Sequence, residues 1–205
     1  DLPWDRYCLV AVGHSAPRPA LHTITDEKLK STQNALDHLS ARGYRRIGMV
    51  TVAAHEKLHS HGRTAAYLQW QQKRPQKRRL PPLRLEDIAD PSPLRPWLRR
   101  HLPEIILSPY DLRETLHQQT PDGASPDFFY LGMSGARRHL SSIQGVLEPN
   151  FEMGIAAADT LAGLVYRYET GPPQPASTIE IPGRLHPAPS GSTIGHGRPT
   201  NPARP

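Results

Sequence analysis

The sequence predicts an α/β protein built on parallel β-sheets. Its central segment, residues 26–52, combines one amphipathic helix with one short apolar strand. The same alternation returns further along the chain, with helices expected over 94–101 and 112–119 and strands over 104–108 and 128–132. Alternating helices and strands of this length are typical of a parallel sheet whose faces are covered by helices.

The central unit begins with a helix over 27–42, whose apolar side chains recur at three- and four-residue spacing and so share one face. These residues are Leu29, Thr32, Ala35, Leu36 and Leu39. Asp26 and Glu27 place negative charge at the positive end of the helix dipole, and Gly43 can take the left-handed conformation that ends a helix. Residues 47–52 are apolar but too few for a helix, so they predict a buried strand.

The remaining segments fit the same fold class. The expected order is a strand over 7–13, a loop over 14–21, a polar loop over 53–60, a helix from 61 to 73, a basic and proline-rich surface crossing over 73–93, a long helix over 151–170 and a strand over 177–181. Residues 186–205 are rich in Gly, Pro, Ser and His and predict a tail that is disordered from about residue 195. The strand at 7–13 has no sheet neighbour before it in the sequence, which would leave an unpaired edge.

Composition and length narrow the class of protein. The 205 residues suffice for two lobes with cores of their own. The one cysteine excludes an intramolecular disulfide and fits a reducing compartment. Cys8 lies within an apolar strand and is expected to be a buried structural thiol. No apolar run approaches the ~20 residues of a membrane helix and no signal sequence opens the chain, so we expect a cytoplasmic protein without a membrane partner.

Two stretches carry a more specific pattern. Residues 35–50, ALDHLSARGYRRIGMV, run from an Ala-x-x-His-Leu helix into a Gly-Tyr-Arg-Arg-Ile-Gly strand. Residues 143–193 contain a Gly-Val near an Asn, a Gly-opened helix, a Glu-x-Gly-Pro stop, an Ile-Pro-Gly strand and a final Gly-Ser-Thr. In this order the two stretches resemble the lactose-repressor (LacI) family of bacterial transcription regulators. The matching positions are Ala35, His38, Leu39, Gly43, Tyr44, Arg45, Arg46, Ile47 and Gly48, then Gly145, Val146, Asn150, Gly154, Ala158, Leu161, Glu169, Gly171, Pro172, Ile181, Pro182, Gly183, Gly191, Ser192 and Thr193.

The resemblance implies a fold of the type I periplasmic-binding-protein kind, with two parallel-sheet lobes, three crossings between them and an incomplete first lobe. Residues 1–25 would then belong to the amino-terminal lobe, 26–143 to the carboxy-terminal lobe, and 144–185 would return to the amino-terminal lobe. Residues 186–205 would form the tail, in which 190–194 could lie back on the carboxy-terminal lobe. The family's DNA-binding domain and the start of its first lobe have no counterpart in the sequence.

The function implied by the resemblance is effector sensing and dimerisation within a transcription regulator, with no enzymatic activity, cofactor or metal. The effector would be a small polar molecule, a sugar or a sugar derivative, held between the lobes, and the oligomer a homodimer. Operator DNA would be contacted only through the domain absent from this chain, so the chain alone should show no preference for an operator sequence. A solute-binding protein for uptake is a further interpretation, which the missing signal sequence disfavours.

Four residues are predicted to bind the ligand. Arg63 stands at the start of a helix after the strand 47–52, where the resemblance places an arginine that enters the cleft. Its planar five-donor group suits sugar hydroxyls, carboxylates or phosphates, and the alternative is an exposed arginine that caps its own helix. His14, Ser108 and Ser134 follow strand ends, where the ligands of parallel sheets usually bind.

Two further motifs have competing interpretations. Residues 55–59, HEKLH, fit the H-E-x-x-H pattern in which two histidines hold zinc and a glutamate activates water. A zinc-dependent hydrolase using His55, Glu56 and His59 is therefore the alternative function, but a third histidine is missing because position 65 is Ala65, so a polar loop is favoured. The basic residues 73–79 lack interleaved aromatic side chains and favour a solvated surface over a nucleic-acid site.

Overall fold

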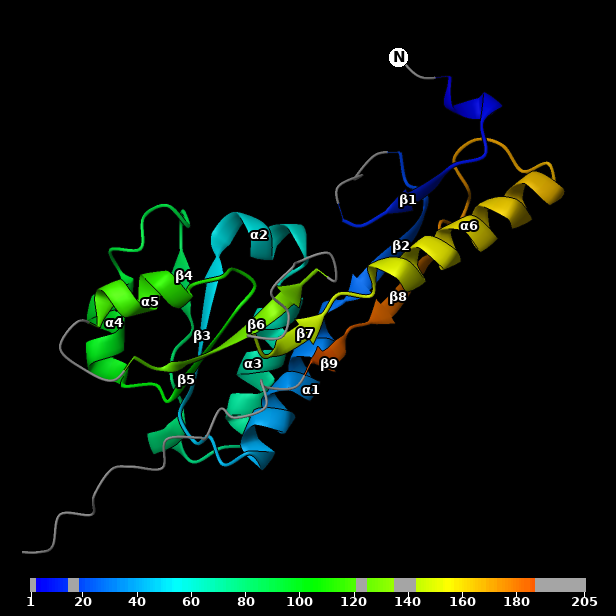
Figure 1. The fold of residues 1–205 in the computed structure, drawn as a ribbon. Helices are drawn as coiled ribbons and strands as arrows, with labels where there is room; N and C mark the ends of the chain where they lie inside the picture. Colours follow the sequence, from blue (N-terminus) through cyan, green and yellow to red (C-terminus); the bar gives the residue numbers. More distant parts are fainter. Residues whose placement is uncertain (1–2, 15–18, 121–124, 135–142, 187–205) are drawn as a thin grey trace, which may run out of the picture.

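The computed structural model describes residues 3–14, 19–120, 125–134 and 143–186, which form two β-sheets with six α-helices around them (Figure 1). The smaller sheet holds β1 (Val10–Val12), β2 (His22–Glu27) and β8 (Thr178–Pro182), all parallel. The larger sheet has the order β4 (Leu83–Leu85), β3 (Ile47–Val52), β5 (Ile105–Ser108), β6 (Asp127–Met133), β7 (Gly145–Leu147) and β9 (Arg184–His186). Only β9 runs antiparallel to its neighbour. The predicted α/β class with parallel sheets is confirmed.

The helices are divided between the sheets. The larger sheet is accompanied by α1 (Lys28–Ala41), α2 (Ala53–Leu58), α3 (Gly62–Gln72), α4 (Leu94–His101) and α5 (Arg113–Gln119). The long helix α6 (Asn150–Tyr166) runs along the smaller sheet and contacts all three of its strands (Figure 1). Two 3-10 turns, η1 (Trp4–Arg6) and η2 (Gln76–Arg78), complete the described elements.

The central unit forms as its sequence predicts. Glu27 precedes α1, and its side chain accepts a hydrogen bond from the Ser31 backbone N–H at 3.0 Å. The helix ends before Gly43, which has a φ of +96°. Strand β3 is buried along its whole length. Leu29 is the exception to the predicted apolar face, because it is 40% exposed.

The core of the larger lobe lies on both faces of its sheet, since successive side chains of a strand point to opposite sides. One face packs against α1 and α3 through Leu36, Leu39, Tyr67, Met49, Leu107 and Phe129. The other packs against α4 and α5 through Leu94, Trp97, Leu116, Val50, Ile106 and Phe128. Gly48 lies where α4 comes closest, since a Cβ added there would be 2.7 Å from Trp97 Cη2.

Three elements differ from the sequence prediction. Residues 22–27 form β2, a strand that the sequence did not predict, so Asp26 and Glu27 lie on a strand rather than at the first helical turn. Residues 53–58 form the short helix α2 instead of a polar loop. Residues 83–85 add the edge strand β4 within the predicted surface crossing. Each is short, so its structure depends on neighbours distant in the sequence rather than on its own periodicity.

The chain passes between the sheets three times. It leaves the smaller sheet between β2 and α1, returns between β7 and α6, and leaves again between β8 and β9. Residues 145–147 and 184–186, which the sequence assigned wholly or in part to a return to the amino-terminal lobe, therefore pair in the larger sheet. The proposed return of residues 190–194 to the carboxy-terminal lobe falls outside the described residues.

The lobe of the smaller sheet has much exposed apolar surface. Phe151 is 77% and Tyr166 is 87% exposed on α6. In the part of the chain that the structure describes, β1 pairs with β2 on one side and with no strand on the other. Cys8 precedes β1 and is half-buried, so the prediction of a buried thiol within a strand is wrong.

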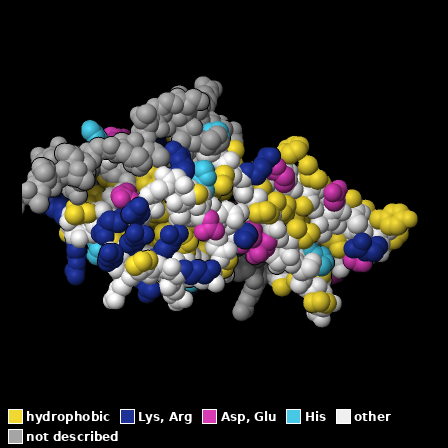
Figure 2. All heavy atoms as spheres, turned by 90° about the horizontal axis from the view of Figure 1, so that it is seen from below, with side chains coloured by type: hydrophobic (Ala, Val, Ile, Leu, Met, Phe, Trp, Pro, Cys, Tyr) yellow, Lys and Arg dark blue, Asp and Glu magenta, His cyan; other side chains and the backbone are white. Residues whose placement is uncertain are grey.

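The basic residues 73–79 lie at the surface of the larger lobe, on a face where Lys and Arg side chains gather (Figure 2). Lys73, Lys77 and Arg79 are exposed, while the guanidinium of Arg74 lies 4.4 Å from the centre of the Trp70 ring.

Among the helices in the described ranges, none combines the length and the apolar character needed to cross a membrane.

Candidate functional site

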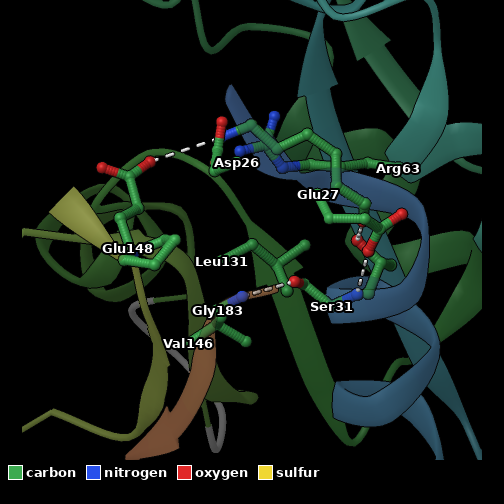
Figure 3. Close-up of a pocket in the computed structure, with 11 residues that line it drawn as sticks. Asp26, Glu27, Ser31, Arg63, Leu131, Val146, Glu148 and Gly183 are labelled. Atoms are coloured by element: carbon green, nitrogen blue, oxygen red, sulfur yellow. Dashed lines mark hydrogen bonds and ion pairs between the residues drawn. The ribbon is translucent and has the colours of Figure 1, made fainter. Parts of the chain in front are cut away.

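The three crossings between the sheets meet at one pocket. Its lining residues come from all three crossings together with α1, α3 and the larger sheet, and they are Asp26, Glu27, Lys28, Ser31, Thr32, Arg63, Leu131, Val146, Glu148, Pro149 and Gly183 (Figure 3). The pocket holds about 250 Å³ of empty space, including the part open to solvent. We call it the hinge pocket, because any movement of one lobe against the other bends the crossings around it.

Charged side chains tie the first crossing to the second. Lys28 has a side chain that is 9% exposed and forms ion pairs with Asp26 and with Glu148, the latter at 3.4 Å between Nζ and Oε1. A nearly buried ammonium group needs such partners, since an unpaired buried charge is costly. Asp26 and Glu148 therefore reach the pocket from different parts of the chain and share one cation.

The third crossing is held against α1. The Gly183 backbone N–H donates to Ser31 Oγ at 2.9 Å. A Cβ at Gly183 would lie 2.5 Å from Val146 Cγ1 and 2.8 Å from the Leu147 carbonyl oxygen, so only glycine lets the crossing pass this close to β7. Figure 3 shows the Ser31–Gly183 hydrogen bond at the floor of the pocket, below Asp26 and Glu148.

Arg63 brings a buried positive charge to the hinge pocket. It lies in the first turn of α3 and is only 1% exposed, and its side chain extends toward Asp26 (Figure 3). Among the described residues its Nη1 atom has no hydrogen-bond partner. Burial lowers the pKa of Arg63, whereas the nearby carboxylates of Asp26, Glu56 and Glu148 act to raise it. The alternative of an exposed arginine capping its own helix is wrong.

A cluster of three histidines lies beside this arginine. Helix α2 places His55 and His59 one turn apart, with their Nε2 atoms 2.9 Å from each other. His14 comes from the end of β1, and its ring centre is 4.6 Å from that of His59. Its Nε2 atom lies 2.6 Å from Thr25 Oγ1 and 3.8 Å from Asp26 Oδ1.

The surroundings keep the two α2 histidines neutral. Burial, followed by the charge of Arg63, lowers the pKa of His55. Burial and the charge of Lys28 lower the pKa of His59 to about 3. A neutral imidazole has one nitrogen that accepts a hydrogen bond, so these two side chains are polar but uncharged.

The side chain of Glu56 holds residues 53–60 in a defined structure. Its side chain is buried, and Oε2 accepts hydrogen bonds from the Thr64 backbone N–H at 3.1 Å and from Thr64 Oγ1 at 2.6 Å. These bonds hold α2 against the start of α3. The other carboxylate oxygen of Glu56, Oε1, has no hydrogen-bond partner among the described residues.

The two predicted serines lie away from the hinge pocket. Ser108 is fully buried at the end of β5, and its Oγ accepts a hydrogen bond from the Tyr110 backbone N–H at 3.1 Å. It therefore shapes the turn after the strand. Ser134 follows β6 and is half-buried. Neither is among the residues that line the pocket.

Sequence reasoning missed Asp26, Lys28 and Glu148. Asp26 was assigned to a helix because β2 was not recognised, although a carboxylate at a strand end would have been a candidate. Lys28 and Glu148 are 120 positions apart, and no local signal brings them together.

Comparison with solved structures supports the resemblance of the fold. A LacI transcriptional regulator from Lactobacillus brevis superposes with a TM-score of 0.59 at 12% identity, covering 87% of this chain and 69% of that one. A LacI-family regulator from Enterococcus faecium, with bound ribose, gives 0.57 at 12% identity over 88% of this chain and 70% of that one. The transcriptional regulator CelR in complex with cellobiose gives 0.56 at 14% identity over 86% and 56%.

No protein-family model matches the sequence, and no curated protein matches it either. At this level of identity the structural likeness concerns the arrangement of sheets, helices and crossings. The chain therefore has the α/β fold, of the periplasmic-binding-protein type, that is found in LacI-family transcription regulators.

Proposed function

We propose that this chain is the effector-sensing part of a bacterial LacI-type transcription regulator, and that it binds a sugar or a sugar derivative between its two lobes. The observation that carries the proposal is the buried Nη1 of Arg63, which has no hydrogen-bond partner among the described residues, in a pocket lined by all three crossings. Such an arrangement couples a binding site directly to the segments that must bend when the lobes move.

The chemistry of the pocket suits a polyhydroxylated ligand. A sugar hydroxyl both donates and accepts hydrogen bonds. Arg63 offers a free donor, while Asp26 and Glu148 offer carboxylate acceptors that at present bind Lys28. Two structural neighbours contain ribose and cellobiose, which are ligands of this class.

The size of the pocket indicates that the lobes separate before the ligand enters. Small-molecule sites usually measure about 300–1,000 Å³, whereas the hinge pocket encloses only about 10 Å³, which is roughly the room that one water molecule needs. A sugar entering here would displace Lys28 from one of its carboxylates and hold the lobes at a new angle. Ligand binding would then shift the population of lobe arrangements, which is the step a regulator needs.

In this proposal the regulator works as a cytoplasmic homodimer. Within the described ranges one edge of β1 has no partner strand, and apolar side chains of α6 are exposed. Both features support an association between copies, since proteins usually cover such surfaces. Operator DNA is contacted by a DNA-reading domain outside these 205 residues.

The test is calorimetric titration of the protein with a panel of sugars that includes ribose and cellobiose. We expect one sugar to bind, and Arg63→Ala to weaken its affinity at least tenfold, because each charge-assisted hydrogen bond contributes roughly 1.5–3 kcal/mol. Arg99→Ala, which removes an exposed arginine on α4, is the matched control and should bind as the native protein does.

Because Arg63 is buried, its loss could also disturb folding, so a second variant is needed. Asp26→Asn preserves the volume of the side chain and removes only the negative charge. It should also weaken sugar binding while the circular dichroism spectrum stays native. Native affinity in both variants would contradict the site.

A further inference from the structure

Lys and Arg side chains gather on one face of the larger lobe (Figure 2), and three segments of the chain supply them. Residues 42–46 lead into β3, residues 73–79 follow α3, and residues 99–104 lead from the end of α4 into β5. We call this surface the basic face, and its members are Arg45, Arg46, Lys73, Arg74, Lys77, Arg78, Arg79 and Arg100. We propose that the basic face binds the phosphate backbone of double-stranded DNA without reading the base sequence.

The side chain of Arg46 joins the three segments into one surface. Its Nη1 atom donates a hydrogen bond to the Lys77 carbonyl oxygen at 3.1 Å, and its Nε atom donates to the Leu102 carbonyl oxygen, also at 3.1 Å. Its Nη2 atom donates to the carbonyl oxygen of His101. Burial, followed by the charges of Arg100 and Arg46, lowers the pKa of His101, so both arginines act on this ring. The surface is therefore continuous, although no single segment indicates it by its own sequence.

Two further arginines of the basic face are held in place by neutral oxygen atoms. Arg74 donates through Nη2 to Ser40 Oγ at 2.8 Å. Arg79 donates through Nε to the Arg74 carbonyl oxygen at 2.8 Å and through Nη2 to the Gln72 carbonyl oxygen at 2.9 Å. A guanidinium has five N–H donors, so each of these groups keeps donors for another partner. Because the side chains are already ordered, a ligand that binds them loses less of its binding free energy to side-chain ordering.

The positive charge of the basic face is not balanced by its neighbours. Glu104 is the one acidic residue in the three segments. Its Oε2 atom accepts hydrogen bonds from the backbone N–H groups of Arg45 and Arg46, at 2.6 and 3.0 Å. Within the described ranges, no ion pair joins a side chain of the basic face to a carboxylate. An extended polyanion is therefore the kind of partner that fits this surface.

The residue types of the basic face favour phosphate groups on a duplex. The planar fork of arginine matches the oxygen atoms of phosphate, whereas single-stranded nucleic acids are usually bound by aromatic rings that stack on the bases. The tryptophans next to these segments are not available for stacking, since Trp70 is 7% and Trp97 is 8% exposed. Contacts to phosphate alone carry no sequence information. The choice of DNA over RNA rests on the proposed function, since a transcription regulator works on DNA, but the charge of the face does not.

The experiment is fluorescence anisotropy of a short labelled DNA duplex of mixed sequence, titrated with the protein between about 50 and 200 mM salt. We expect a Kd of roughly 10⁻⁴–10⁻⁶ M at physiological salt and a logarithmic salt slope of about −0.9 for each phosphate that is neutralised. The combined substitution of Lys73→Gln, Lys77→Gln and Arg100→Gln changes exposed residues only. It should weaken binding at least tenfold and reduce the magnitude of the salt slope by about 2–3.

The matched control removes the same charge from elsewhere on the surface. The combined substitution of Lys30→Gln, Lys57→Gln and Arg167→Gln changes exposed residues on or next to α1, α2 and α6. This variant should retain the native affinity and salt slope, because charges far from the bound DNA are screened by salt. Equal loss of affinity in the two variants would overturn the proposal, since binding would then depend on net charge and not on the basic face. Lack of binding by the native protein at low salt would overturn it too.

Two further ligands test the choice of duplex DNA. Tighter binding to an RNA duplex of the same length, or binding to vesicles of anionic phospholipid without binding to DNA, would overturn the assignment to DNA. A preference for one DNA sequence would contradict binding through the backbone alone. The sugar titration is a separate measurement: its failure would contradict the sensor, while loss of DNA binding in the variant of the basic face alone would still establish the basic face.

Discussion

At the scale of single residues, close packing and buried charge restrict which side chain a position can hold more strongly than hydropathy does. Arg63 is nearly inaccessible and yet keeps one guanidinium nitrogen unpaired. Gly48 sits in a strand of apolar residues, where its lack of a side chain allows α4 to approach. Arg63 was predicted from the sequence to bind the ligand, whereas the role of Gly48 follows only from the packing around it.

Gly48→Ala should destabilise the protein. The added methyl group would lie 2.7 Å from Trp97 Cη2 and 3.0 Å from Ile106 Cδ1, inside the core. Overpacking of this kind typically costs about 1–3 kcal/mol. Urea denaturation followed by circular dichroism measures the free energy of unfolding. Gly154→Ala is the control, because a Cβ there meets nothing within 4 Å in α6, and the change should stabilise that helix by up to about 1 kcal/mol.

At the scale of elements, what can be predicted from the sequence is what local chemistry specifies. Helix α1 and strand β3 are recognisable because a helix periodicity, a left-handed glycine and an apolar run lie within one continuous segment. Helix α4 also forms over the predicted residues 94–101. Strands β2 and β4 and helix α2 carry no comparable signal, because they acquire their structure from partners that are far away in the chain.

The start of α1 offers a test of local stabilisation. The side chain of Glu27, the residue that precedes α1, accepts a hydrogen bond from the Ser31 backbone N–H in the first turn of the helix. Glu27→Ala should therefore lower the free energy of unfolding by about 1 kcal/mol. Asp37→Ala, at an exposed position on the same helix, should change it by less than about 0.5 kcal/mol. Equal effects of the two substitutions in urea denaturation would argue against the cap.

At the scale of the whole molecule, the two sequence stretches that resemble LacI regulators carry the fold but not the details of the site. The resemblance implied two lobes and three crossings, and the structure has them. Arg63 was predicted from its position after a strand and from the resemblance, and it lines the hinge pocket. The contacts of Lys28 with Glu148 and of His14 with His59 join distant segments, so they require the folded chain.

The predicted homodimer belongs to this scale. Sedimentation equilibrium should give twice the 22.9 kDa mass of the chain. Val12→Lys places a charge on β1, which has a partner strand on one side only in the part of the chain that the structure describes. Val12 is 56% exposed, and the charge should shift the equilibrium toward the monomer. Leu68→Lys, at a 46% exposed position on α3, should leave it unchanged. A native protein that stays monomeric at high concentration would contradict the dimer.

The three crossings also determine how the lobes can move mechanically. The crossings are linked to one another through Lys28 and through the Ser31–Gly183 hydrogen bond. Linked segments of this kind bend readily about one axis and resist twisting and sliding. A ligand bound at the crossings would therefore rotate one lobe against the other about a single axis, whatever the chemical identity of the ligand. Ligands of different size would differ in the angle of that rotation and not in its direction.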